Sequence, residues 1–170
     1  MKLNEEQKRE LEELYLSFLN NEKIQRMKDI PMHRGSNCYL HSFKVAKLAI
    51  RNGLRYKSVD LKKILIASIL HDYYLYDWRK DRSLRKKHGS RHPHIASDNA
   101  IKDFNIDKSI QKIIKSHMWP INFLDFPDSK EARILGVADK TITIKEASSS
   151  KAFKKKKEAY YYNYISKLFK

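Results

Sequence analysis

The chain has 170 residues, 41% of them hydrophobic, and its 36 basic against 20 acidic residues give a formal net charge of +16. This length suits one domain with a substantial core, and the scarcity of glycine and proline, four of each, argues against a loop-rich sandwich or barrel. The single Cys38 excludes an intramolecular disulfide, and no apolar stretch approaches the length of a membrane span. We therefore expect an all-α bundle. Because Met1 to Asn4 lead straight into charged residues rather than an apolar leader, we also expect a cytoplasmic location.

The excess of positive charge favours anionic ligands. Lysines are scattered along most of the chain rather than gathered in one motif. Net charge therefore favours small anionic, phosphate-containing ligands among others without selecting one, and nucleic acid bound through the basic surface is the less favoured alternative. The sequence is compatible with a monomer and with a homodimer.

The first thirty residues are predicted to form a helical cover over the core. A helix is expected from Asn4, its capping residue, to Leu19, with an apolar stripe on one face. A short helical turn from Ile24 to Ile30 should end before Pro31, because a proline disfavours helix in the residue before it. We expect the segment 31–147 to be the functional core, with a polar loop from Met32 to Asn37 at its beginning.

Two helices with inward-facing polar residues follow. The first starts at Ser36 or Asn37 and runs to about Asn52, and its apolar spacing places His41 on the buried stripe. The second starts at Ser58 or Asp60 and ends at His71-Asp72, where it meets the core. Burying a carboxylate without compensation is costly, so this pair needs hydrogen-bond partners or a metal ion.

The middle of the chain is expected to be less regular. The aromatic run from Tyr73 to Trp78 either belongs to the core or lines a pocket in which it stacks a nucleobase. The charged segment from Arg79 to Lys87 is interpreted as an exposed loop, with a cationic lid as the alternative. Pro93 suits the first position of the next helix, which makes His92 its capping residue and leaves His94 inside the first turn.

The last two core helices again carry polar residues on apolar faces. One begins at Asp107 or Ser109 and places His117 on its stripe before Pro120. After a loop, a helix from Glu131 to about Glu146 places Asp139 inward. The remaining segment, 148–170, is basic and rich in tyrosine, and is expected to be a terminal helix or tail.

Helical segments that are far apart in the sequence therefore each direct an ionisable side chain toward the core. Imidazole and carboxylate groups are the preferred protein ligands of borderline and first-row divalent ions, and a cation offsets the cost of burying several carboxylates. The sequence predicts a buried metal site from His41, His71, Asp72, His92, His117 and Asp139.

The order of His41, His71-Asp72 and Asp139 resembles the signature of the HD-domain superfamily, a helical fold of metal-dependent phosphohydrolases. The resemblance spans about Ser36 to Glu146, and small bacterial HD proteins share the look of residues 71–78, 88–93 and 117–120. His92-Pro93 and His117 are similar to the extra histidines of the two-metal branch, seen in HD-GYP phosphodiesterases and in di-iron oxygenases such as myo-inositol oxygenase. The chain lacks the Gly-Tyr-Pro signature, which argues against cyclic dinucleotides.

The resemblance implies a role for each residue. His41, His71 and Asp139 would hold one divalent ion, His92 and His117 a second, and Asp72 would bridge them; Fe, Mn, Co, Ni or Zn is expected, with Mg as an alternative. A metal-bound hydroxide would then attack a phosphomonoester, nucleotide or related phosphoester. Beside Asp72, the expected catalytic residues are Lys140 and Arg91. Candidates of a second tier are His33, His88 and His94, and His94 is also the alternative to His92 as a metal ligand.

Two other functions use the same features. A di-iron oxygenase would need the same ligand set. A non-catalytic module for nucleic acid or an anionic surface would use Lys154 to Lys157 and Tyr160 to Tyr162.

Overall fold

The computed structural model describes residues 3–32, 36–80 and 82–148. The regular secondary structure in these residues is helical, apart from one isolated bridge between Pro31 and Asn37. The expected all-α class is therefore confirmed. The helices are α1 (Glu5–Leu19), α2 (Glu22–Gln25), the 3-10 helix η1 (Arg26–Asp29), α3 (Cys38–Gly53), α4 (Leu61–Leu70), α5 (Arg82–Phe104), α6 (Lys108–Ser116) and α7 (Lys130–Ser148).

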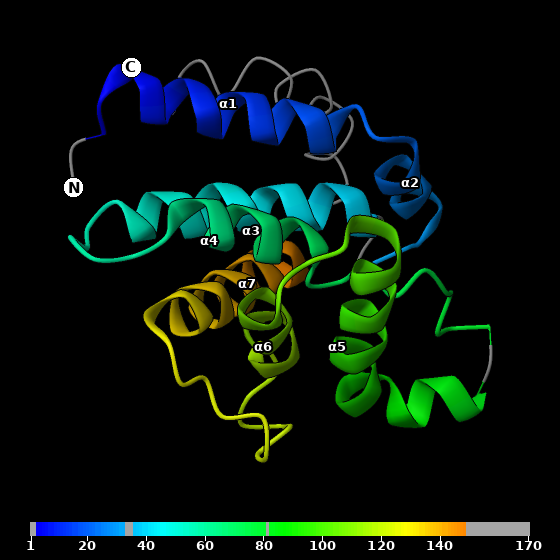
Figure 1. The fold of residues 1–170 in the computed structure, drawn as a ribbon. Helices are drawn as coiled ribbons and strands as arrows, with labels where there is room; N and C mark the ends of the chain where they lie inside the picture. Colours follow the sequence, from blue (N-terminus) through cyan, green and yellow to red (C-terminus); the bar gives the residue numbers. More distant parts are fainter. Residues whose placement is uncertain (1–2, 33–35, 81, 149–170) are drawn as a thin grey trace.

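The core lies around α3 and α4, which pack against each other and against α7 (Figure 1). Helix α1 lies along the outer face of this pair, while α5 and α6 lie on the opposite side. Fully buried side chains from all these layers meet in the interior, among them Phe43, Ile64, Leu70, Ile114 and Leu135. This apolar packing fixes the positions of the helices from which, or directly after which, the polar residues of the interior project.

Four helices begin where side-chain caps predict them to begin. Asn4, Asn37, Asp60 and Asp107 each accept a hydrogen bond from a backbone N–H of the following first turn. Such caps stabilise a helix by about 1 kcal/mol each. The predicted starts of α1, α3, α4 and α6 are therefore confirmed.

Gly53 is the last residue of α3, one residue beyond the end expected at about Asn52. A Cβ atom at this position would lie 2.7 Å from Cδ2 of Leu61 and 3.0 Å from Cδ1 of Ile64. The glycine therefore allows α3 and α4 to approach closely, in addition to marking the helix end.

The prediction for the start of α5 is wrong. The segment interpreted as a loop from Arg79 to Lys87 is helical from Arg82 onward, and Pro93 lies inside the helix rather than at its first position. His92 is consequently an interior helical residue and caps nothing. Lysine and arginine are good helix formers, and the proline ring crowds the carbonyl group four residues earlier, which here belongs to Gly89.

The remaining expectations concern membrane-spanning helices and residues near the ends of the described segments. None of the described helices combines the length and apolar character that crossing a bilayer demands. His33 and the basic segment with Lys154 to Lys157 and Tyr160 to Tyr162 lie outside the described residues. The division into a cover, a core and a tail stays a prediction.

Candidate metal centre

Five helices direct six ionisable side chains to one place inside the bundle. His41 comes from α3 and Asp139 from α7, whereas His92 lies in the middle of α5. His71-Asp72 and His117 directly follow the last residues of α4 and α6. All six are buried.

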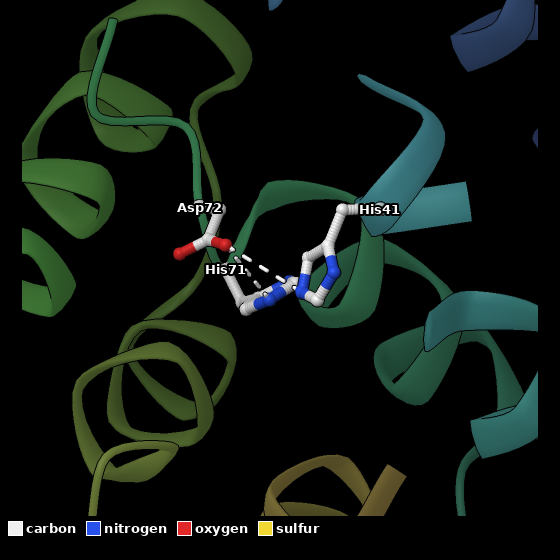
Figure 2. Close-up of side chains that lie close together, drawn as sticks. All are labelled: His41, His71 and Asp72. Atoms are coloured by element: carbon white, nitrogen blue, oxygen red, sulfur yellow. Dashed lines mark ion pairs between the residues drawn. The ribbon is translucent and has the colours of Figure 1, made fainter. Parts of the chain in front are cut away.

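Asp72 lies at the centre of this cluster. Its Oδ2 is 3.3 Å from Nε2 of His71 and 3.7 Å from Nε2 of His41. Its Oδ1 is 3.3 Å from Nε2 of His92 and 3.9 Å from Nε2 of His117. Figure 2 shows the first pair of imidazoles turned toward one carboxylate oxygen, while the other oxygen points away from them. The two oxygens thus face different imidazoles, as a bridging carboxylate requires.

Asp139 closes the cluster on the side of His41 and His71. Its Oδ1 lies 3.1 Å from Nε2 of His41 and 3.7 Å from Nε2 of His71, and it accepts a hydrogen bond of 3.3 Å from Thr143 Oγ1. Potential ligand atoms lie within 4.8 Å of one another in three groups: His41, His71 and Asp72; His71, His117 and Asp139; and Asp72, His92 and His117. His117 therefore adjoins both halves of the cluster.

Three of the imidazoles are held in one tautomer by backbone carbonyls. Nδ1 of His71 donates to Ser68 O at 2.8 Å, Nδ1 of His92 to His88 O at 2.8 Å, and Nδ1 of His117 to Ile114 O at 2.7 Å. A carbonyl only accepts, so each Nδ1 carries the proton and the Nε2 of the neutral ring presents a lone pair.

These lone pairs converge without a donor between them. Nε2 of His92 lies 3.0 Å from Nε2 of His117, and the buried Nε2 of His71 has no hydrogen-bond partner. Two carboxylates, Asp72 and Asp139, adjoin the same atoms. Buried acceptors that face one another are costly unless a cation lies among them. The donor set therefore fits divalent ions of the kind that bind imidazole and carboxylate.

Burial lowers the pKa of His41 and His71, but the neighbouring carboxylates outweigh it, so the pKa of His41 is raised to about 9 and that of His71 well above its usual value. A cation bound by these two rings would displace a proton from each.

The other groups of the cluster whose pKa is shifted are already in the form that binds metal. Burial and the neighbouring charges of His71 and His92 lower the pKa of His117 to about 3, which keeps this ring neutral. Burial alone would raise the pKa of the Asp72 and Asp139 carboxyl groups, but the adjoining histidines hold both well below the usual value. Neutral imidazole and ionised carboxylate are the forms that bind metal.

Glu146, which the sequence reasoning missed as a functional residue, orients His41. The buried carboxylate accepts from Nδ1 of His41 at 2.9 Å and from Ser36 Oγ at 3.1 Å, and it pairs with Lys44. Burial opposes its ionisation, but His41 and Lys44 lower its pKa to about 2. The ring of His41 is thereby fixed with Nε2 toward Asp139. The sequence did contain a signal for Glu146. This residue lies two helical turns after Asp139, so both carboxylates lie on the same face of the helix.

A cavity of about 390 Å³ opens directly above the cluster, and it is lined by only some of the other candidates. Lys140 lines it, and its Nζ donates to His117 O at 3.0 Å. His88 also lines it, with its ring stacked between Trp78 and His92 at centroid distances of 5.1 and 4.6 Å. Arg91 is exposed and is not among the lining residues.

The remaining candidates have other partners. His94 is largely exposed and pairs through Nε2 with Oδ2 of Asp125 at 2.8 Å, away from the cluster. Tyr73 and Tyr74 are buried core residues that do not line the cavity. This agrees with the expectation that the aromatic run belongs to the core. Their hydroxyl groups donate to Asp103 and to Met32 Sδ.

A family model described as HD domain matches residues 38–144. The match begins at the first residue of α3 and ends within α7, so it contains all six residues of the cluster. Searches among curated proteins and among solved structures gave no match.

Proposed function

Because the chain belongs to the HD domain family, whose members are generally metal-dependent phosphohydrolases, we propose that it hydrolyses a phosphomonoester, nucleotide or related phosphoester at a dinuclear metal site. His41, His71 and Asp139 would hold one ion, His92 and His117 the other, and Asp72 would bridge them. The imidazole-rich set favours Fe, Mn, Co, Ni or Zn over Mg, which prefers oxygen ligands.

The observation that carries this proposal is the position of Asp72 between two sets of imidazoles. One of its oxygens faces His41 and His71, the other faces His92 and His117, and the lone pairs of at least three of these rings point inward. When bound, two ions would lower the pKa of a water molecule and neutralise charge on a phosphoryl group.

The residues of the chain contribute positioning and charge. Glu146 holds the ring of His41, and backbone carbonyls hold the other three rings, so that the ligand atoms are preorganised. Lys140 brings an ammonium group to the cavity wall, where it can bind a phosphate oxygen.

Metal content and phosphate release test the proposal together. We expect purified protein loaded with Mn²⁺ to release phosphate from members of a phosphoester panel. Asp72→Ala should lower this activity by at least about a thousandfold and reduce the bound metal, because the bridging group is lost. Asp128→Ala is the matched control, since exposed Asp128 pairs with Lys112 at the surface and does not line the cavity.

Protein that binds metal but releases no phosphate from any member of the panel would contradict the proposal. Oxygen uptake by an iron-loaded form, dependent on an organic substrate, would then support the oxygenase alternative.

A further inference from the structure

The cavity above the cluster has an apolar wall. Beyond five of the six cluster residues, all but His71, its lining contains the side chains of Met32, Met118, Ile121 and Ile144. These come from four separate places in the chain: the segment before α3, the start and the middle of the α6–α7 connection, and α7. An apolar surface next to a polar base is the arrangement that binds a ligand with one charged end.

The polar groups of the wall are few and already engaged. Thr143 Oγ1 donates to Asp139, and Nδ1 of His88 is hydrogen bonded to the hydroxyl group of Tyr76 at 3.0 Å. The ammonium group of Lys140 lies 3.0 Å from His117 O and 3.5 Å from Gly136 O. The wall therefore provides charge for one phosphate group, and little for the hydroxyl groups of a sugar or for a chain of phosphates.

The rim of the cavity is apolar as well. Ile121 and Ile144 are both 67% exposed, and both line the cavity. The α6–α7 connection that carries Ile121 is tied to α5, because Asn122 Nδ2 donates to Ser90 O at 2.9 Å and Asp125 pairs with His94 at 2.8 Å. This apolar rim is thus held in place beside the metal ligands, where an apolar ligand would remove it from water.

We propose that the substrate is a phosphomonoester with an apolar organic group, alkyl or aryl, that packs against Met118, Ile121 and Ile144. The inference rests on the proposed function for the position of the phosphate group over the cluster. It adds that the affinity for the substrate depends on the apolar area of its organic group.

Binding of n-alkylphosphonates, which are not hydrolysed, tests this without turnover. Protein loaded with Mn²⁺ is titrated by calorimetry with methyl-, butyl- and hexylphosphonate. We expect Kd to fall by up to about fourfold for each added methylene, and the heat-capacity change to become more negative along the series. Equal Kd values for methyl- and hexylphosphonate, or no binding of any of them, would overturn the inference.

Turnover of the corresponding n-alkyl phosphates separates the two proposals, because their leaving groups are alcohols of similar acidity. Hydrolysis of the series combined with equal Kd values overturns the apolar preference alone. Chain-length-dependent binding without hydrolysis overturns the proposed function, and with it the role of the ligand as a substrate, but leaves the apolar preference of the cavity standing.

Substitutions at the rim locate the effect. Ile121→Asn and Ile144→Asn should weaken hexylphosphonate binding by about five- to tenfold each and leave methylphosphonate binding unchanged. Leu124→Asn and Val137→Asn are matched controls, since these residues are 83% and 59% exposed in the same connection and helix but do not line the cavity. A loss of the same size in the controls would place the apolar contact elsewhere and overturn the assignment.

Discussion

At the scale of single residues, the cluster depends on side chains that never touch its centre. His41 differs from the other three histidines because its Nδ1 donates to the carboxylate of Glu146 rather than to a carbonyl. A carboxylate behind a ligand imidazole fixes the tautomer and raises the basicity of the ligand atom. Glu146 in turn is held by Ser36 and Lys44, so this contact joins the first half of α3 and the residue before Asn37 to the last turn of α7.

We predict that Glu146→Gln weakens metal binding without unfolding the protein. The amide keeps the size of the side chain but loses the charge that makes His41 a better ligand, and such changes lower metal affinity by about 10- to 100-fold. Competition with a chelator of known affinity measures the effect. Glu10→Gln, which removes a surface partner of Lys62, should leave metal affinity unchanged. Equal affinities of wild-type protein and Glu146→Gln would show that Glu146 does not act through His41.

At the scale of helices, the first residues of four helices were predicted correctly, whereas the proline inside α5 was not. The caps of α1, α3, α4 and α6 are local signals, because each cap bonds the turn that follows it. Pro93 has two local interpretations, a first position or a kink inside a helix, and only the packing of α5 against its neighbours decides between them. His92 lies in the cluster, as expected, although it does so from inside the helix rather than from its start. Its role as a metal ligand stays a prediction.

We predict that Gly53→Ala destabilises the protein by about 1 to 3 kcal/mol, because the added methyl group would overlap Leu61 and force the closely packed α3 and α4 apart. Unfolding in urea, followed by circular dichroism, gives the free energy of unfolding. The matched control is Gly136→Ala in α7, where the added Cβ would lie 3.5 Å from its nearest neighbour, His117 O, in ordinary contact. This control should be stabilising by about 0.5 to 1 kcal/mol, since alanine favours helix over glycine. A neutral effect of Gly53→Ala would mean that the side chains of Leu61 and Ile64 move aside at a cost no larger than the helix propensity gained with alanine.

At the scale of the whole molecule, the cluster brings together side chains from α3, α5 and α7 and from the residues that follow α4 and α6. Periodicity placed His41, His71, His117 and Asp139 on inward faces, and the resemblance to the family suggested how they are combined. Which atoms meet is a tertiary property: the position of His117 next to both His71 and His92 follows from how α6 packs against α4 and α5. The apolar wall likewise could not be predicted, because Met32, Ile121 and Ile144 belong to one surface only after folding.

Because the cluster gathers groups from α3, α4, α5, α6 and α7, a cation bound there would oppose the separation of all five helices. We predict that removing metal with a chelator lowers Tm and that adding Mn²⁺ restores it. At a metal concentration of about 100 times Kd the stabilisation is about 2.7 kcal/mol, which for a chain of this size corresponds to a shift of about 5 to 10 °C. Thermal unfolding followed by circular dichroism measures both forms. Asp72→Ala should unfold at a temperature that neither chelator nor Mn²⁺ changes, whereas Asp128→Ala, which removes a surface partner of Lys112, should respond as the wild-type protein does. A wild-type Tm that is equally insensitive to both additions would mean that the inward-facing imidazoles bind no cation strongly enough to hold the helices together.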